Sequence, residues 1–236
     1  MNKRLKHPGI NVKVNGTGMM VVKVGGSVAR AGICVLKRVL EELSHSKTPL
    51  LIVPGGWIFA DFVRLVDCSH NLGETAHDMA IAGMEIYAML ISHIGGFDRI
   101  TFDRITLEEL DEKFDEKSFK GIYVLMPYSS RIQESELPKS WDVTSDSIAI
   151  WVASKLKDWG LGGKTVLKIT DVDGVYRNGR FCERVRARDA LGCIDRYSIR
   201  LIEERGIDVF VCNGLKAGRV KGYIVEGKTL GTLIER

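Results

Sequence analysis

Two apolar segments near the start of the chain, residues 19–24 and 50–53, each lead into a pair of glycines. A strand that ends in glycines just before a helix brings backbone N–H groups close to an anion, so two such loops can hold two sides of one phosphate-rich ligand. Lys23 lies inside the first segment, where a charge is costly unless it faces a negative group. The alternative is two ordinary strand-to-helix turns and an isolated lysine. The candidate phosphate contacts are Gly25, Gly26, Ser27, Gly55 and Gly56.

Strand and helix signals alternate along the rest of the chain. Short apolar runs predict strands at residues 19–24, 50–53, 99–102, 121–126, 164–170, 208–211 and 232–234. Apolar residues at helical spacing predict helices at residues 28–44, 58–66, 74–94, 107–114, 145–157, 198–205 and 217–226. This alternation favours an α/β fold with a mainly parallel sheet covered on both faces. Asn178-Gly179 indicates a hairpin turn, and the aperiodic residues 132–142 are a candidate substrate loop.

Composition argues against several other classes of protein. The net charge of +4 is mild and the basic residues are dispersed, so we expect no nucleic-acid partner. The five scattered cysteines are typical of reduced thiols in a cytoplasmic protein and give no zinc site, and we expect no protein ligands to a metal. Residues 80–94, the longest apolar stretch, are too few to span a membrane. Residues 1–18 contain no apolar run, and we expect an N-terminal extension followed by one domain over residues 19–236.

Phosphoryl transfer needs positioning and positive charge around the transferring group rather than covalent help from the protein. Lys23 is one source of that charge, and Lys216 is a second, just before the helix at 217–226 whose N-terminus adds partial positive charge. Two lysines aimed at one phosphate repel each other and need a buried carboxylate between them. Asp146, which follows the predicted N-cap Thr144, is the best candidate. The alternative is that Asp146 only stabilises the N-terminus of its own helix.

An acidic segment, residues 170–176, follows the strand predicted at 164–170. Asp171 at the end of this strand is placed to meet a ribose, a base or the shell of a metal ion. Gly174 is placed to allow a tight turn. The alternative is a simple acidic turn with no ligand.

Six segments, in this order, resemble the amino acid kinase family, which includes acetylglutamate, carbamate, uridylate and isopentenyl phosphate kinases. They are Val22-Lys23-Val24-Gly25-Gly26-Ser27, Pro54-Gly55-Gly56, Thr144-Ser145-Asp146-Ser147, Thr170-Asp171-Val172-Asp173-Gly174-Val175-Tyr176, Asn213-Gly214 and Gly231-Thr232-Leu233-Ile234. The resemblance implies a three-layer αβα fold with an eight-stranded, mainly parallel sheet. Residues 19–143 would bind the acceptor, and residues 144–236 would bind ATP.

The resemblance also implies roles for individual residues. Lys23 and Lys216 would stabilise the transition state, and Asp146 would organise them. The residues implied to contact the nucleotide are Thr170, Asp171, Asp173, Gly174, Tyr176, Asn213 and Gly214.

Asp61 and residues 140–147 narrow the choice of acceptor, and Trp57 departs from the family pattern. Isopentenyl phosphate kinases carry a histidine where this chain has Asp61, which argues against an isoprenoid acceptor. Trp57 replaces a third glycine common in the family. Three interpretations are open: Trp57 narrows the acceptor pocket, it stacks on a furan ring of the substrate, or it caps the turn. With residues 140–147, the glycine segments look most like an archaeal branch of the family that acts in methanofuran biosynthesis and converts an aminomethylfuran phosphate monoester to its diphosphate. The implied acceptor contacts are Trp57, Asp61, Asp142 and Thr144.

The expected function is that of an enzyme, an ATP-dependent kinase that phosphorylates a small phosphorylated substrate in the cytoplasm and forms a homo-oligomer. Mg²⁺ is expected to bridge the β- and γ-phosphates of ATP. Two alternatives stay open. One is a kinase of the same fold acting on a nucleoside monophosphate, isopentenyl phosphate or a carboxylate. The other is a nucleotide or oxyanion storage protein.

Overall fold

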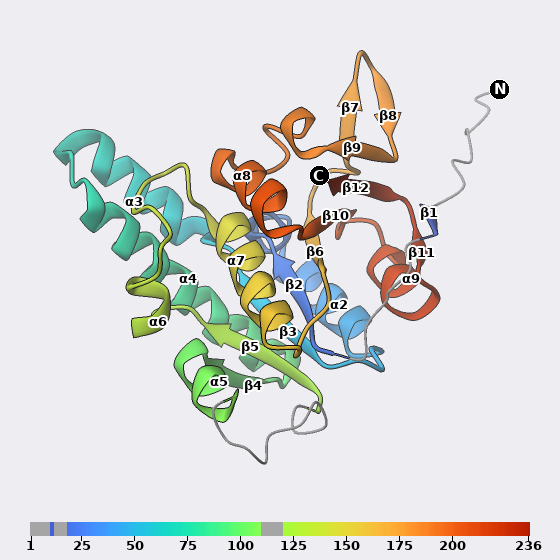
Figure 1. Cartoon of the computed structure of the whole chain (residues 1–236), viewed down its shortest axis with the longest axis horizontal. Coiled ribbons are helices and arrows are strands. Elements are labelled where there is room, and N and C mark those ends of the chain that lie inside the picture. Colours follow the sequence, from blue (N-terminus) through green and yellow to red (C-terminus); the bar gives the residue numbers. More distant parts are fainter. Residues whose placement is uncertain (1–9, 12–17, 110–119) are drawn as a thin grey trace.

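An eight-stranded sheet forms the centre of the protein in this computed structural model, which describes residues 10–11, 18–109 and 120–236. In spatial order its strands are β4 (Asp98–Thr101), β5 (Ile122–Met126), β3 (Leu50–Pro54), β2 (Met20–Val24), β6 (Thr165–Thr170), β10 (Asp208–Asn213), β12 (Gly231–Glu235) and β9 (Arg184–Arg186) (Figure 1). The first six are parallel to one another. Strand β12 is antiparallel to β10 and parallel to β9. The expected eight-stranded, mainly parallel sheet is confirmed.

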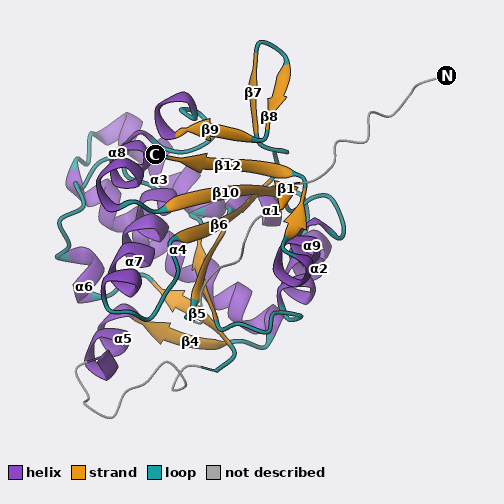
Figure 2. Ribbon diagram, turned by 45° about the vertical axis from the view of Figure 1, so that its right-hand side comes forward, coloured by secondary structure: helices purple, strands orange, loops and turns teal. Residues whose placement is uncertain are grey.

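Helices cover both faces of this sheet. They are α1 (Gly26–Arg30), α2 (Ile33–Leu43), α3 (Trp57–His70), α4 (Glu74–Gly95), α5 (Phe102–Glu109), α6 (Ser130–Gln133), α7 (Ser145–Asp158), the short η1 (Ala187–Asp189), α8 (Arg196–Arg205) and α9 (Arg219–Glu226). Helices α2 and α9 lie on one face and α7 and α8 on the other (Figure 2). Each face buries its own apolar core, which gives the three layers that the alternating sequence pattern predicts.

The described residues also form two small two-stranded sheets. Strands β7 (Val175–Arg177) and β8 (Arg180–Cys182) pair antiparallel, which confirms the hairpin predicted at Asn178-Gly179. Strand β1 (Ile10–Asn11) pairs with β11 (Lys228–Thr229), so part of the expected N-terminal extension joins the C-terminal region. The rest of residues 1–17 lies outside the described residues.

The clearest differences from the sequence-based expectation concern α1 and α2, α5 and β9. The prediction of a single helix over residues 28–44 is wrong. This segment forms two helices, α1 and α2, separated at Gly32, whose φ of +133° does not fit a helix. Helix α5 starts at Phe102 rather than at residue 107, and residues 110–114 of the prediction lie outside the described residues. Strand β9 was not predicted, since its three residues include two exposed arginines and give almost no apolar signal.

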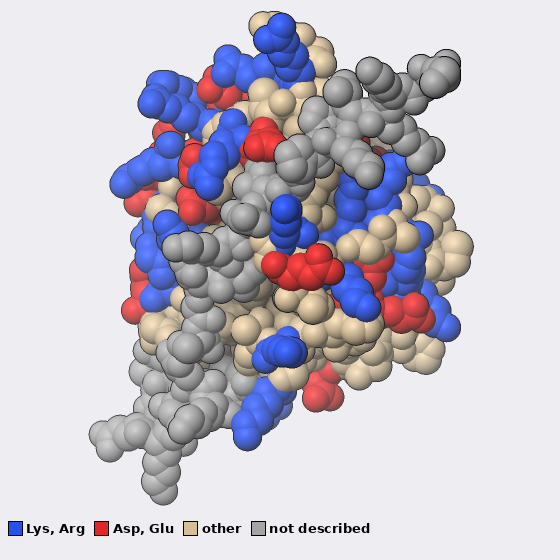
Figure 3. Space-filling view, turned by 90° about the vertical axis from the view of Figure 1, so that its right-hand side faces the viewer, with Lys and Arg blue, Asp and Glu red and all other residues tan. Residues whose placement is uncertain are grey.

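Charged side chains are mixed on the face of the molecule shown in Figure 3, where basic and acidic groups lie interspersed. Among the described residues, no helix is both long enough and apolar enough to cross a bilayer.

A buried glutamate on α2 holds the start of α9. The carboxylate of Glu42 accepts hydrogen bonds from the backbone N–H of Gly218 (2.8 Å) and of Lys221 (3.0 Å), and its side chain is only 11% exposed. These donors are N–H groups that a helix N-terminus otherwise leaves without a partner. Glu42 therefore occupies the positive end of the α9 dipole and fixes α9 against α2.

Replacing Glu42 with alanine should lower the free energy of unfolding by about 1–2 kcal/mol, because two backbone N–H groups lose their acceptor. Urea unfolding monitored by circular dichroism measures the change. The exposed neighbour Glu41 provides the matched control, and Glu41→Ala should change stability by less than about 0.5 kcal/mol. Equal effects of the two substitutions would contradict the capping role.

Candidate active site

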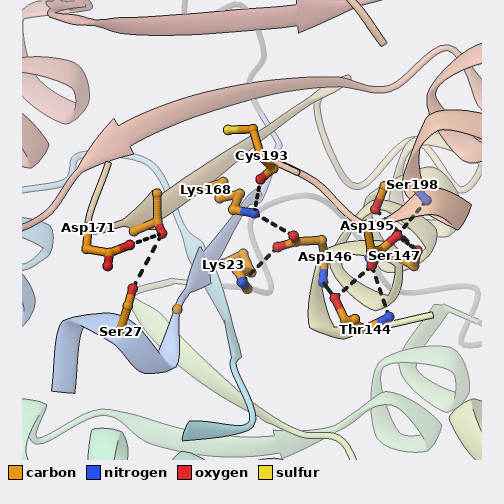
Figure 4. Close-up of polar contacts among 12 residues, drawn as sticks. Lys23, Ser27, Thr144, Asp146, Ser147, Lys168, Asp171, Cys193, Asp195 and Ser198 are labelled. Carbon is orange, nitrogen blue, oxygen red and sulfur yellow. Dashed lines mark hydrogen bonds and ion pairs between the residues drawn. The ribbon is translucent and has the colours of Figure 1, made fainter. Parts of the chain in front are cut away.

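Two lysines from adjacent strands share one carboxylate at the centre of the sheet (Figure 4). Lys23 of β2 and Lys168 of β6 are directly paired in the parallel register, so both side chains lie on the same face. The Nζ of Lys23 lies 2.7 Å from Oδ1 of Asp146, and the Nζ of Lys168 lies 2.5 Å from Oδ2. Two like charges side by side are destabilising. Asp146 offsets that repulsion and leaves the three buried groups with a net positive charge.

The start of α7 places Asp146 between the lysines. Thr144 is the N-cap residue, and its Oγ1 accepts a hydrogen bond of 3.2 Å from the N–H of Asp146, as the sequence predicted. Ser145, Asp146 and Ser147 are all buried, so this first turn faces the interior instead of solvent. The interpretation in which Asp146 only stabilises its own helix does not explain its two ion pairs.

Burial and charge act in opposite directions on these groups. Burial by itself would raise the pKa of Asp146, but the positive charges of Lys168 and Lys23 outweigh it and lower that pKa to about 2. Burial also lowers the pKa of Lys23, and the charge of Asp146 opposes this while that of Lys168 adds to it. Asp146 is therefore ionised at neutral pH and helps to keep Lys23 protonated.

The structure pairs Asp146 with a different second lysine from the one expected from sequence. Lys168 contacts Asp146, whereas Lys216 is exposed in the turn between β10 and α9 and is not among the described contacts of Asp146. The α9 N-terminus that follows Lys216 is occupied by Glu42. The sequence could have indicated Lys168 as a site residue, because it lies inside a predicted apolar strand just as Lys23 does.

The two glycine loops lie against each other, because β2 and β3 are neighbours in the sheet. A Cβ on Gly55 would lie 2.7 Å from the N of Gly26, and a Cβ on Gly26 would lie 2.5 Å from the Cα of Trp57. Glycine is required at both positions for this close approach. The predicted pairing of the loops in space is therefore what the structure has.

Only some of the loop amides are available to a phosphate. The N–H of Gly25 donates to Ile169 O (2.9 Å) and that of Gly55 to Val24 O (2.8 Å), so these two amides are used within the sheet. For Gly26 and Ser27, the described residues provide no hydrogen bond from the backbone N–H. We therefore restrict the expected amide donors of the first loop to Gly26 and Ser27.

Trp57 has a backbone conformation that favours glycine. Its φ is +46°, in the left-handed region, where a residue with a side chain is strained by about 1–2 kcal/mol. This is the position at which the resembling family carries a third glycine. The indole contacts the rings of Phe59 (5.7 Å between centroids) and Tyr87 (5.4 Å), and it lines the pocket beside the loops. Trp57 thus narrows that pocket, while stacking on a substrate ring stays a prediction.

A pocket of about 200 Å³ opens beside the glycine loops and the start of α7. Of the acceptor contacts expected from sequence, Trp57, Asp61 and Thr144 line this pocket. Asp142 is not among the described lining residues; its side chain is 60% exposed and lies 3.8 Å from Arg196. The lining residues that sequence reasoning did not single out include Arg30, Arg64, His77, Trp141 and Ser145.

The charges in this pocket favour an anion. Asp61 forms an ion pair with Arg30, and Arg64 lies 4.0 Å from the same carboxylate. The guanidinium of Arg64 also lies over the ring of Trp141, 4.7 Å from its centroid. Two arginines and one aspartate give the pocket a net positive charge, which suits a phosphorylated ligand.

His77 adds a neutral polar group to the pocket. Its Nδ1 lies 3.3 Å from the carbonyl oxygen of Ser140, which can only accept a hydrogen bond, so Nδ1 carries the proton. Burial lowers the pKa of His77, which favours the neutral ring and leaves Nε2 as an acceptor. The pocket therefore pairs its positive charge with an acceptor for an N–H or O–H group.

The expected nucleotide residues gather at the ends of β6 and β10. Asp173 accepts hydrogen bonds from Asn213 Nδ2 (2.8 Å) and from Arg219 Nη1 (2.6 Å). Asp171 is exposed and accepts from Thr170 Oγ1 (3.1 Å), while Gly214 donates its N–H to Thr170 O (2.8 Å). Tyr176 is 55% exposed on the β7–β8 hairpin, and Gly174 packs closely on Thr232. Arg219 was not singled out from sequence.

The fold and the sequence together assign the chain to a class of phosphoryl-transferring proteins. Residues 18–213 match the sequence profile of the Amino acid kinase family, so the chain belongs to that family of kinases. A kinase uses ATP as its co-substrate. The resemblance drawn from the six sequence segments is thereby confirmed.

One relative is named for a specific substrate. The [5-(aminomethyl)furan-3-yl]methyl phosphate kinase of Methanocaldococcus jannaschii is 29% identical over 216 residues, which cover 89% of this chain and 94% of the relative. Similar solved structures include uridylate kinase from Archaeoglobus fulgidus (TM-score 0.65, 18% identity, covering 92% of this chain and 99% of the other). An isopentenyl phosphate kinase is also similar (TM-score 0.58, 17% identity, 92% and 99%). At these identities the solved structures show the shared fold alone.

Acidification should remove the stabilisation that Asp146 provides. Its folded-state pKa of about 2 lies below the 3.8 of the free side chain, so the contribution is fully present above about pH 4 and is lost as the pH falls through about 2. The loss should be about 2 kcal/mol. Urea unfolding at a series of pH values measures it.

The variant Asp146→Asn should lack this part of the pH dependence. The exposed Asp171→Asn is the matched control and should keep the wild-type slope. If Asp146→Asn and the wild type lost stability in parallel, the ion pairs would not be coupled to folding.

Proposed function

We propose that this protein is an ATP-dependent kinase that converts a small phosphate monoester, [5-(aminomethyl)furan-3-yl]methyl phosphate, to its diphosphate. The observation that carries the proposal is the Lys23–Asp146–Lys168 cluster beside a positively charged pocket. The acceptor is taken from the relative with 29% identity over 89% of this chain. We further propose the cytoplasm as its location and a homo-oligomer as its state.

The proposed reaction is a direct in-line transfer. An anionic oxygen of the acceptor phosphate attacks the γ-phosphorus of ATP and forms a new P–O bond. The bond from the γ-phosphorus to the β,γ-bridging oxygen breaks, and its electron pair leaves with ADP. Because a phosphate monoester has a second pKa of about 6, the attacking oxygen carries no proton near neutral pH and no general base is required.

The residues around the cluster supply positive charge where negative charge spreads onto the transferring group. Lys23 and Lys168 provide two ammonium groups, and Gly26 and Ser27 provide backbone N–H donors from the neighbouring loop. Such fixed donors cost no reorganisation at the moment of reaction. Gly26 and Ser27 line the acceptor pocket together with Thr144 and Ser145, the two residues before Asp146, so an acceptor phosphate there adjoins these amides and the start of α7.

Mg²⁺ is proposed to arrive with the nucleotide. The described residues contain no group of three or more His, Cys, Asp or Glu side chains that could hold a metal ion. Mg²⁺ keeps water ligands and commonly binds through substrate phosphates, so the ion can be held mainly by ATP without a cluster of protein ligands. When bound, the ion would neutralise charge on the β- and γ-phosphates.

Acceptor recognition is proposed to use the charges and rings of the pocket. Arg30 and Arg64 favour the phosphate, and Asp61 together with His77 Nε2 provides acceptors for a protonated amine. Trp57 and Trp141 provide flat surfaces for an aromatic ring. Asp142 is the weaker candidate for the amine, because it lies on the exposed surface beside Arg196.

An acceptor panel tests the proposal. Purified protein with Mg-ATP is expected to form a diphosphate from the aminomethylfuran phosphate, detected by phosphorus NMR, and to leave UMP, isopentenyl phosphate and N-acetylglutamate unchanged. Turnover of UMP or isopentenyl phosphate would replace the proposed acceptor and keep the reaction class, whereas turnover of N-acetylglutamate would replace the phosphate acceptor by a carboxylate. Binding of ATP without turnover of any acceptor would reject the proposed function and favour storage.

Substitution of each lysine tests the corrected assignment. Lys168→Met should lower kcat by about 10²–10³-fold, as does removal of one donor that stabilises transition-state charge, and Lys23→Ala should do the same. Lys216→Met should act on KM for ATP and lower kcat by less than about tenfold. Steady-state kinetics of the three variants give the comparison. A larger kcat loss for Lys216→Met than for Lys168→Met would reverse the assignment.

A further inference from the structure

The short segment of residues 190–195, between η1 and α8, contacts two parts of the lysine cluster: Lys168 itself and the first turn of α7, which carries Asp146 (Figure 4). The carbonyl oxygen of Cys193 accepts a hydrogen bond of 2.5 Å from Lys168 Nζ. Two residues later, the carboxylate of Asp195 reaches the first turn of α7, which carries Asp146. One short stretch of chain therefore contacts both Lys168 of β6 and α7, the helix that carries Asp146.

Asp195 accepts five hydrogen bonds, and every donor lies at the start of a helix. Its Oδ2 accepts from Thr144 N (2.9 Å), Thr144 Oγ1 (2.7 Å) and Ser147 N (3.1 Å). Its Oδ1 accepts from Ser147 Oγ (2.6 Å) and Ser198 N (2.7 Å). Asp195 is thus the N-cap residue of α8 and also holds the N-terminus of α7.

The contact with Thr144 continues to Asp146. The hydroxyl of Thr144 donates to Asp195 and accepts from the N–H of Asp146, so its proton direction is fixed. Asp146 is held from its backbone by this relay and from its side chain by the two lysines. Thr144 also lines the acceptor pocket, so the relay reaches the substrate side of the site.

From this geometry we infer that Asp195 is a positioning residue, which fixes Asp146 between Lys23 and Lys168 through Thr144. Asp195 touches neither lysine in the described contacts and acts through α7. The inference rests on the proposed role of the lysines in phosphoryl transfer. A displacement of about 1 Å at a reacting centre can cost about 100-fold in rate, so a residue that fixes this turn should be visible in kcat.

The isosteric variant Asp195→Asn is the sharpest test. All five groups around the carboxylate are used as donors, and an amide has only one oxygen. Whichever way the amide lies, its NH₂ group faces at least one backbone N–H, and the α7 cap is lost or the α8 cap is lost. Leu201→Ala is the matched control, because Leu201 is a buried residue of α8 with no part in the polar network.

Two measurements are made on the full-length protein. The first is kcat with Mg-ATP and whichever acceptor turns over. Asp195→Asn is expected to lower kcat by about 10–100-fold, and Leu201→Ala by less than threefold despite a lower melting temperature. The second needs no acceptor: the titration of Lys23 is followed by NMR of ¹³C-labelled lysine side chains.

The pH at which Lys23 titrates should fall in Asp195→Asn. The groups facing Lys23 are Asp146 from α7, Lys168 from β6, and Asp195 and Cys193 from the 190–195 segment. Burial lowers the pKa of Lys23, and the negative charges of Asp146 and Asp195 oppose that effect. Asp195→Asn removes one of these charges and loosens the other, so Lys23 should titrate at lower pH than in the wild type. Leu201→Ala should leave the titration where it is.

The outcomes separate the two proposals. A kcat loss confined to Asp195→Asn together with a lower Lys23 titration supports the positioning role. A kcat loss that Leu201→Ala matches, or an unchanged Lys23 titration, overturns it. If no acceptor turns over, the proposed function fails, and an unchanged Lys23 titration would still overturn the positioning role of Asp195.

Discussion

The structure depends on one buried carboxylate that holds two buried ammonium groups side by side. Lys23 and Lys168 are direct neighbours in the parallel register of β2 and β6, where side chains of the same sign repel. Burial lowers the pKa of Lys23 and so favours its neutral form, which has little value for binding a phosphate, and the charge of Asp146 opposes this. The ion pairs at 2.7 and 2.5 Å keep positive charge in a place where it would otherwise be expelled. This arrangement requires the β2–β6 pairing and the position of α7 at the same time.

The glycine loops and the helix termini place the other charges around this cluster. Gly26 and Gly55 permit two backbone segments to touch, and the amides of Gly26 and Ser27 stay available beside Lys23. The N-terminus of α9, by contrast, is satisfied inside the protein by Glu42. The N-terminus of α1 thus offers the amides of Gly26 and Ser27 to the site, whereas the N-terminus of α9 is used to pack α9 against α2. The side chains beside each terminus make the difference.

The sequence predicted much of the fold and a part of the site. The alternation of strands and helices, the Thr144 cap and the hairpin at Asn178-Gly179 are local features, and the structure confirms them. The break at Gly32 was missed because the apolar spacing continues across it, while a φ of +133° is invisible in such a pattern. Lys216 was chosen because it precedes a helix, but the N-terminus of that helix is capped by Glu42, which lies in a distant part of the chain.

By itself, the sequence determined that two strands end in paired glycines, that a lysine lies inside an apolar strand, and that an aspartate opens a capped helix. Each is a property of a few consecutive residues and their backbone preferences. The tertiary structure decided which lysine pairs with Asp146, which loop amides are used within the sheet, and that Asp195 reaches across to α7. These contacts join residues far apart in the chain, and the strand order that brings them together follows from burying both faces of the sheet at once.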